Sequence, residues 1–321
     1  MFHKRSAGFP HKRKGMMYMD EKNTEQAYLA SVDNNGIFEN RASDAYPQTI
    51  VADLIRAHLQ SGGEKRKKVL LFGFDGARAD SMIYLIPSTD PDLTGHNLRS
   101  RYSAIADLKE QGGLYLTYAG GDPARKETLQ ETSTAQGWAA ILTGKWGIEN
   151  GVVNHVTKRA DCPTVLMEAA QKGMSALFAS IWPDHFTITY RQEMEQAEAK
   201  ALPLTFRQVA DEDALQQVLL NAVDADADVI FGINEFADYN GHGSGFGSEN
   251  YRYVVGITNS DRCAYEVIAH IKARPTYKEE DWLLLITSDH GGHGYGHGTQ
   301  QIEDRMTFLA VNKPLPPAMK Q

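Results

Sequence analysis

The sequence is poor in cysteine and has no long apolar run. Its 321 residues include two cysteines, Cys162 and Cys263, which are too few for a disulfide framework in a chain of this length. Neither belongs to a CxxC pair, so a thiolate metal site is also excluded. A transmembrane helix requires about 18 consecutive apolar residues, and no such run occurs. We therefore expect reduced, structural cysteines and no membrane partner.

Signals of several other protein classes are missing as well. The basic N-terminal residues up to Lys14 precede no apolar segment, so they do not form a secretory signal, and a cytoplasmic protein is expected. No GxGxxG motif follows the first predicted strand, which disfavours a redox protein that binds a dinucleotide. The formal net charge is -8, with 33 basic and 41 acidic residues. Nucleic acid is therefore not an expected specific partner, whereas an anionic substrate is compatible because bound metal ions reverse the local charge.

The chain is predicted to form one α/β domain behind a polar N-terminal segment. Residues 1–45 are weakly patterned and are predicted to be a mobile tail, while residues 46–321 contain no linker that would divide them. Short apolar runs predict buried strands at 69–74, 175–181, 228–234, 282–287 and 306–311. Helical spacing predicts helices at 49–59, 163–172, 211–223 and 250–272; Tyr251, near the start of the last one, is expected in the core. This alternation predicts a mostly parallel central sheet with helices on both faces.

Four polar clusters lie at or shortly after the ends of predicted strands or before a helix, where open α/β sheets bind their ligands. Asp75 directly follows the first predicted strand and is either a helix N-cap or a metal ligand. The hydroxyl residues 132–134 (Thr-Ser-Thr) precede a short apolar helix that ends at Thr143-Gly144. A hydroxyl at a helix N-terminus lies near free N–H groups and the positive end of the helix dipole, which favour deprotonation and bind anions. An ordinary N-cap is the alternative.

The other two clusters combine carboxylates with imidazoles. Asp238 and His242 are four residues apart in a glycine-rich segment, predicted to be a loop, and this pair suits zinc and related ions; an incidental histidine is the alternative. The segment 288–298 reads SDHGGHGYGHG, and three histidines among glycines favour a metal site over a solvated turn. Together the clusters offer three Asp, three His and a hydroxyl, about the ligand set that two divalent ions roughly 4 Å apart require.

The order of these motifs resembles that of the alkaline phosphatase superfamily, and most closely its nucleotide pyrophosphatase/phosphodiesterase branch. The resemblance covers about Val69 to Val311 and includes a Thr nine residues before the Thr of a Thr-Gly pair. It implies an alkaline-phosphatase-like fold, two divalent ions and hydrolysis of a small phosphate ester by double displacement. Zinc is the expected metal, with manganese as the alternative, because three imidazoles favour it over magnesium.

The resemblance also implies residue roles. One ion would be held by Asp75, Asp289 and His290. The other would be held by Asp238, His242 and His297. Thr134 would be the nucleophile, would form a phospho-threonine intermediate, and would also be a ligand of the first ion. Asn154 would contact the phosphoryl oxygens, and His293 would lie outside both ligand sets.

The chain departs from the family pattern after the Thr-Gly pair. Asn150 stands where relatives often carry a histidine, and Asn154 is about one position early, so His155 is an alternative contact. Neither the CxPxR-type motif of sulfatases nor the Asp-Ser-Ala element of the monoesterase branch surrounds Thr134, which favours diesters. A phosphomonoesterase, a phosphonate hydrolase or a mutase on the same scaffold is the enzymatic alternative. A non-catalytic protein that binds metal or phosphate is the other class.

Two aromatic residues are further candidates. Trp138 and Phe246 could stack on the leaving group of a substrate, such as a nucleobase. For Trp138 the alternative is packing of its helix against the sheet.

Overall fold

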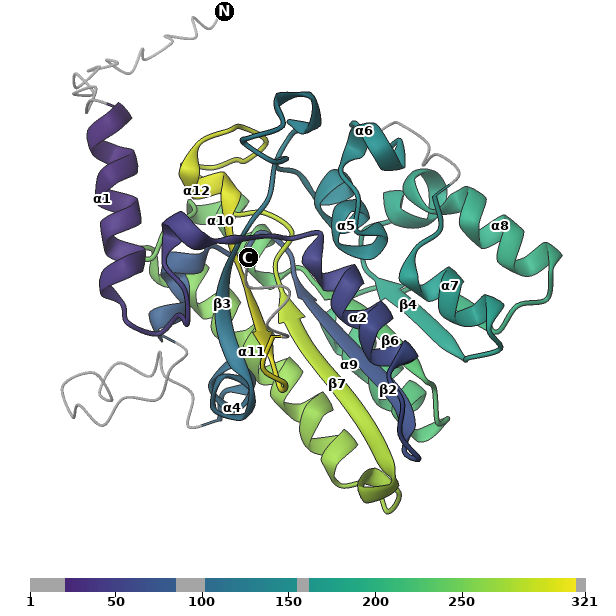
Figure 1. Cartoon of the computed structure of the whole chain (residues 1–321). Coiled ribbons are helices and arrows are strands. Elements are labelled where there is room, and N and C mark those ends of the chain that lie inside the picture. The colour runs from purple at the N-terminus through teal and green to yellow at the C-terminus, as the bar shows by residue number, and fades with distance from the viewer. Residues whose placement is uncertain (1–20, 85–101, 155–161, 316–321) are drawn as a thin grey trace, which may run out of the picture.

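The computed structural model describes residues 21–84, 102–154 and 162–315 (Figure 1). Within these residues, eight strands form one sheet in the order β1-β3-β8-β7-β2-β6-β4-β5. The strands are Tyr46–Pro47 (β1), Arg66–Phe74 (β2), Gly113–Tyr118 (β3), Ala176–Ser180 (β4), Leu204–Gln208 (β5), Val229–Asn234 (β6), Glu280–Thr287 (β7) and Met306–Val311 (β8). Every pair is parallel except the pairs that β8 makes with β3 and β7. The predicted mostly parallel sheet is confirmed.

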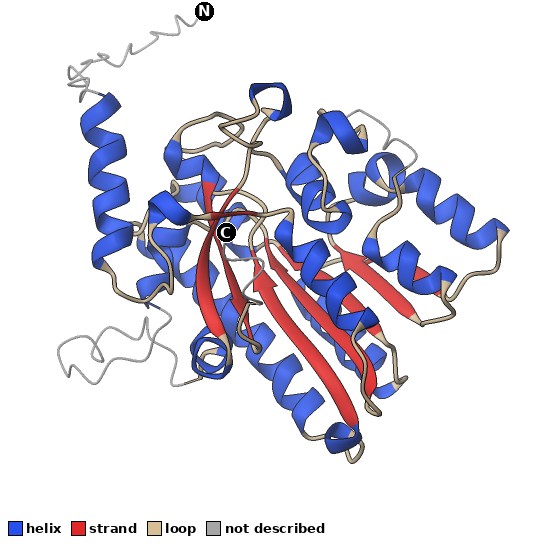
Figure 2. Ribbon diagram, viewed as in Figure 1, coloured by secondary structure: helices blue, strands red, loops and turns tan. Residues whose placement is uncertain are grey.

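Helices cover both faces of the sheet (Figure 2). They are Glu21–Asn34 (α1), Ile50–Gln60 (α2), Ala104–Gln111 (α4), Thr134–Thr143 (α5), Gly147–Asn150 (α6), Val165–Gln171 (α7), Arg191–Ala199 (α8), Glu212–Asp224 (α9), Phe236–Ser244 (α10), Tyr251–Lys272 (α11) and Ile302–Arg305 (α12). Helices α2, α5 and α7 pack on one face, and α4, α9 and α11 pack on the other. The central strand β2 faces both layers, because Leu70 and Phe72 join one core while Val69 and Leu71 join the other.

The five predicted strands are present, and three others were not predicted. Strand β1 has two residues, and β5 lies at the edge of the sheet with only its first residue buried. Neither gives the continuous apolar run that identifies a buried strand. Strand β3 is buried along most of its length, but it begins in a Gly-Gly pair and mixes Leu with Tyr and Thr. Its pairing with β8 is what makes it a strand.

Two local predictions are wrong. The segment with Asp238 and His242 is a helix, α10, rather than a glycine-rich loop. Its Gly241 is required by packing, since a Cβ there would lie 2.4 Å from the ring of Phe246, so this glycine marks a close helix contact. Tyr251 is 61% exposed rather than in the core, because it lies on the outward face of the first turn of α11, whose inward positions are the buried ones.

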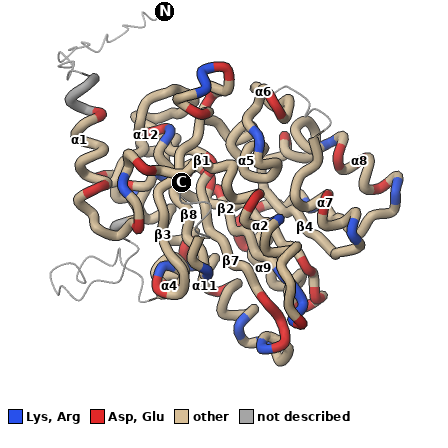
Figure 3. The backbone as a smooth tube through the Cα atoms, viewed as in Figure 1, with Lys and Arg blue, Asp and Glu red and all other residues tan. Residues whose placement is uncertain are grey.

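The N-terminal segment contributes to a small third core. Helix α1 lies beside the sheet (Figure 1) and buries Tyr28 and Val32 against Leu116 and Met306. Arg78, at the loop after β2, packs its guanidinium 5.1 Å from the centre of the Tyr28 ring. In the described residues, no helix combines the length and apolar character needed to cross a membrane. Figure 3 shows acidic and basic residues intermingled along the visible helices and loops.

Candidate metal centre

The polar clusters meet beyond the carboxyl ends of four neighbouring strands, β7, β2, β6 and β4, whose arrowheads point to the same edge of the sheet in Figure 1. Asp75 follows β2, the helix with Asp238 follows β6, and Asp289 follows β7. Parallel strands bring their carboxyl ends together. Residues more than 200 positions apart in the chain are therefore neighbours here.

The first group consists of Asp75, Asp289 and His290, all buried, with ligand atoms within 4.8 Å of one another. We call it the inner triad. The Nε2 atom of His290 lies 3.5 Å from Asp75 Oδ1 and 3.4 Å from Asp289 Oδ2. Thr134 Oγ1 lies 3.4 Å from Asp75 Oδ1 and 3.3 Å from His290 Nε2. The hydroxyl that the sequence singled out therefore points into the inner triad.

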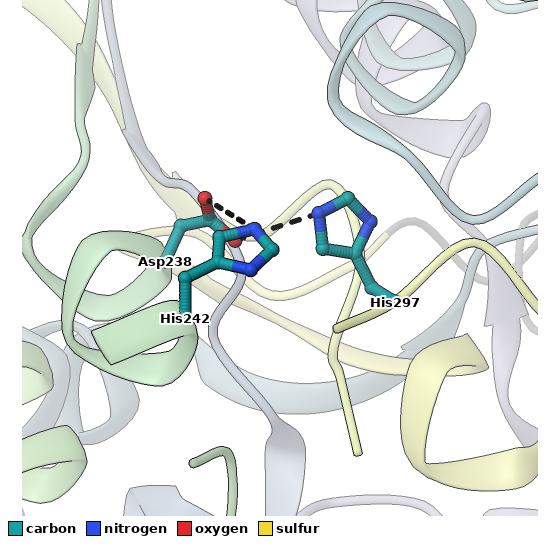
Figure 4. A group of neighbouring side chains, drawn as sticks. All are labelled: Asp238, His242 and His297. Atoms are coloured by element: carbon teal, nitrogen blue, oxygen red, sulfur yellow. Dashed lines mark ion pairs between the residues drawn. The ribbon is translucent and has the colours of Figure 1, made fainter. Parts of the chain in front are cut away.

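The second group consists of Asp238, His242 and His297, which we call the outer triad (Figure 4). The spacing of four residues on α10 places Asp238 and His242 on one face of the helix, with His242 Nε2 3.4 Å from Asp238 Oδ2. His297 reaches the group from the loop after β7, with Nε2 3.7 Å from Asp238 Oδ1. The rings of His290 and His297 stack at 3.9 Å, so the two triads adjoin.

In each of the three triad histidines, the Nδ1 atom lies within hydrogen-bond distance of a main-chain carbonyl oxygen. Nδ1 of His290 lies 2.7 Å from the oxygen of Gly291, Nδ1 of His242 lies 2.9 Å from the oxygen of Tyr295, and Nδ1 of His297 lies 3.0 Å from the oxygen of Thr132. A carbonyl oxygen only accepts, so each Nδ1 carries the proton. Each neutral imidazole then turns the lone pair of Nε2 toward the carboxylates of its triad. This is the tautomer that a metal ligand needs.

The two triads bring three carboxyl groups together with imidazoles that are neutral in this tautomer. Burial and the neighbouring Asp289 raise the pKa of Asp75 well above its ordinary value, and burial does the same for the pKa of Asp289. Burial also raises the pKa of Asp238. Oδ1 of Asp238 and Oδ2 of Asp289 accept no hydrogen bond from the described residues. A buried carboxylate is stable when it is paired or bound to a metal, so this donor set fits two divalent cations.

Helix α5 brings Thr134 to the inner triad. Thr134 is the first residue of the helix, and its first-turn N–H groups lie at the same end. Gly137 allows the approach, because a Cβ there would lie 2.6 Å from the backbone oxygen of Asp289. Trp138 is fully buried against the sheet, and its indole Nε1 donates to Asp75 Oδ2 at 2.9 Å. Trp138 therefore packs and orients a triad carboxylate, and it is not available for stacking on a ligand.

Gly76 also allows a close approach, in this case between the residues after β2 and the side chain of Asp238. Its φ is +68°, and a Cβ there would lie 2.7 Å from Asp238 Oδ1. We expect Gly76→Ala to displace Asp238 and to weaken binding at the outer triad at least about tenfold. The clash with Asp238 should also lower the free energy of unfolding of Gly76→Ala by about 1–3 kcal/mol more than backbone strain alone would. Zinc titration and thermal unfolding of the purified proteins measure both effects.

Gly173→Ala is the matched control for this prediction. Gly173 has a φ of +82°, and no heavy atom lies within 4 Å of the place that a Cβ would take. Its substitution therefore introduces left-handed strain of about 1–2 kcal/mol without a clash, and it should leave zinc binding unchanged. Equal zinc affinity in the two variants would show that Gly76 does not set the position of Asp238.

A hollow of about 250 Å³ opens onto both triads. Its walls are formed by Asp75, Thr134, Trp182, Glu235, Asp238, His242 and His297. Sequence reasoning assigned no role to Trp182 or Glu235. Trp182 follows β4 and Glu235 follows β6 directly, so their positions after strand ends were the available signal. Burial raises the pKa of Glu235 to about 7, although its carboxylate accepts a 2.8 Å hydrogen bond from the Trp182 backbone N–H.

Other residues considered from the sequence lie around the hollow or away from it. Asn150 is buried and binds backbone groups of the α5–α6 turn, with its Nδ2 2.7 Å from the Lys145 oxygen. Asn154 is half-buried and does not belong to the hollow's lining, and His155 lies outside the described residues. His293 contacts Asp304 through Nδ1 at 2.7 Å and belongs to neither triad. Phe246 is buried against His242 and His297.

Comparison with known proteins finds similarity only among solved structures, since no family model and no curated protein matches the chain. Murine ectonucleotide pyrophosphatase/phosphodiesterase 5, an inactive form solved with AMP, is 15% identical with a TM-score of 0.45, over 70% of this chain and 57% of that chain. Phosphonoacetate hydrolase from Sinorhizobium meliloti is 10% identical with a TM-score of 0.44, over 71% of this chain and 57% of that chain. This chain thus spans little more than half the length of either protein.

Alkaline phosphatase from the Antarctic bacterium TAB5 is also similar, at 10% identity and a TM-score of 0.41, over 77% of this chain and 91% of that chain. The solved structures that are similar to this chain thus include an alkaline phosphatase and a nucleotide pyrophosphatase/phosphodiesterase. Identities and TM-scores this low do not transfer an activity.

Proposed function

We propose that this protein is a two-metal hydrolase of phosphoric esters, of the phosphodiesterase or nucleotide pyrophosphatase type, with Thr134 as the nucleophile. The observation that carries the proposal is the position of Thr134 Oγ1, 3.3 to 3.4 Å from two members of a buried Asp-Asp-His triad and beside a second triad. A binding protein would need the triads but not the hydroxyl. Thr134 also begins α5, whose end attracts anions.

Each group of residues in the site has its own role in the proposed reaction. The inner triad would hold one ion and the outer triad the other. Two bound ions would lower the pKa of the Thr134 hydroxyl and neutralise charge on the phosphoryl group; zinc is our choice, with manganese as the alternative. Trp138 fixes the carboxylate of Asp75, and the first-turn N–H groups of α5 would donate to a phosphoryl oxygen. Asn154 is a further proposed contact for that oxygen.

The reaction proceeds in two displacements. Thr134 Oγ1 forms a bond to phosphorus, the ester P–O bond on the opposite side breaks, and the alcohol leaves with the proton that the hydroxyl gave up. Water then attacks phosphorus in the phospho-threonine, the Thr134 Oγ1–P bond breaks, and the hydroxyl is restored. The two halves have the same stereochemical course, so the configuration at phosphorus is retained overall.

The charge of the hollow favours a diester over a monoester. Among the described residues that line it there is no Lys or Arg, and Glu235 adds a carboxylate to those of the triads. A monoester dianion carries one more negative charge than a diester and meets no cationic side chain here. Trp182 instead offers an apolar wall to the second ester group.

A rate comparison tests this proposal. With zinc or manganese supplied, we expect kcat/KM for bis-p-nitrophenyl phosphate to exceed that for p-nitrophenyl phosphate by at least about tenfold, equivalent to roughly 1.4 kcal/mol. The reason is the missing cationic side chain. A preference for p-nitrophenyl phosphate would indicate a monoesterase, and a preference for p-nitrophenyl phenylphosphonate a phosphonate hydrolase. No turnover of any of the three would contradict the enzymatic assignment.

A further inference from the structure

A second hollow of about 420 Å³ adjoins the first and shares His242 with it. Its lining consists of Tyr239, Asn240, His242, Gly243, Ser244 and Arg252, and we call it the α10–α11 hollow. The side chain of Asn250 ties the two helices together, because its Nδ2 donates to the backbone oxygen of Ser244 at 2.6 Å. The hollow is therefore part of a fixed helix contact beside the outer triad.

The walls of this hollow combine an aromatic ring with a cation. Tyr239 is 77% exposed, although it lies between the triad residues Asp238 and His242 on α10. Arg252 is exposed and contacts Asn250 through its backbone N–H, while its guanidinium makes no hydrogen bond or ion pair with any residue that the structure describes. An exposed aromatic ring and an unneutralised arginine beside a catalytic site are features of a ligand subsite.

The proposed reaction would expel its leaving group toward the α10–α11 hollow. We call the first hollow the reaction hollow. Thr134 lies against the inner triad, and the residues of the outer triad also line the reaction hollow. An in-line displacement by Thr134 expels the leaving group on the side of phosphorus turned away from the hydroxyl. The atoms that follow the leaving oxygen then pass His242, the residue shared by the two hollows.

We infer that the α10–α11 hollow binds the leaving group of the substrate, and that this group is a flat ring carrying an anionic substituent. The ring lies against Tyr239, and the anionic substituent, a carboxylate or a phosphate, pairs with Arg252. The inference rests on the proposed function and adds the substrate class. It also places the second negative charge of such a substrate beyond His242, outside the reaction hollow, whose described lining residues include no Lys or Arg.

The experiment compares two diesters that differ only in the leaving group. One releases p-nitrophenol, and the other releases p-nitrophenol with a carboxylate beside the nitro group. In the zinc-loaded protein we expect Arg252→Ala to lower kcat/KM about tenfold for the carboxylated diester and less than about twofold for the uncharged one. Arg252→Lys should recover part of the loss. Tyr239→Ala should lower kcat/KM for both aryl diesters.

Arg262→Ala is the matched control, since Arg262 lies on the same helix and pairs with Glu266 away from the hollow. It should change neither rate constant. Equilibrium dialysis with the carboxylated phenol gives a readout without turnover, and Arg252→Ala should weaken that binding about tenfold. If Arg252→Ala lowers kcat/KM equally for both diesters, or leaves phenol binding unchanged, the inference is overturned while wild-type turnover still supports the proposed function. No wild-type turnover of either diester would overturn the proposed function itself.

Discussion

The Thr134→Ala variant, loaded with zinc, is expected to lose at least about a thousandfold in kcat while both ions stay bound. The hydroxyl is the only group of Thr134 that the proposed reaction uses, and removing it leaves water as the attacking group. The inner triad keeps its three other ligand atoms, so zinc content should remain near two ions per chain. Steady-state rates and metal analysis of the same preparation measure both quantities.

Two neighbouring variants serve as controls for this result. Thr134→Ser keeps a hydroxyl at the first position of α5 and should retain a measurable part of the activity. Ser133→Ala changes the adjacent hydroxyl at the N-cap and should lower kcat far less than Thr134→Ala. If Thr134→Ala keeps full activity, the nucleophile is Ser133 or water, and a large loss with Ser133→Ala alone would identify Ser133.

Metal removal has the second large expected effect. Metal analysis should give about two divalent ions per chain, and dialysis against a chelator should abolish turnover, because the ions supply several kcal/mol of charge stabilisation. Ions should leave the outer triad first. His242 has 47% of its side chain exposed, whereas the side chains of the inner triad are at most 2% exposed. One ion or none in fully active protein would contradict the two-metal site.

Single substitutions assign the ions to the triads. Asp289→Ala should remove the inner ion and His297→Ala the outer one, each with loss of turnover. His293→Ala is the control, because His293 lies in the same loop as His297 but contacts Asp304 rather than a triad. It should retain both ions. If His293→Ala loses an ion while His297→Ala does not, the assignment within the loop is reversed.

The three aspartates of the site could be identified from the sequence because each comes shortly after a strand that is itself easy to recognise, whereas Thr134 was found by its place at the start of a helix. Asp75, Asp238 and Asp289 follow β2, β6 and β7, which are continuous apolar runs. Parallel strands bring such positions together, so the pattern was enough to predict that these residues share one site; their division into two groups was implied by the family resemblance. The structure brings together the same two groups.

What the sequence did not provide depends on packing between distant segments. The glycines of α10 look like loop residues until Phe246 is seen against Gly241. Trp182 carries no motif and becomes relevant only because β4 is next to β6 in the sheet. In the sequence alone, nothing distinguishes Arg252 from the other arginines. Only the junction of α10 with α11 places it beside His242. These contacts cross between elements and have no local signature.

The main-chain acceptors of the three histidines have a consequence for how the site can change over time. The Nδ1 of each ring lies within hydrogen-bond distance of a backbone oxygen, at Gly291, Tyr295 and Thr132. Every amino acid supplies that oxygen, so replacement of the side chain at such a position does not remove the acceptor. The tautomers are encoded by the path of the chain rather than by residue identity. An alignment of relatives would find the histidines that hold the metal and miss the groups that orient them.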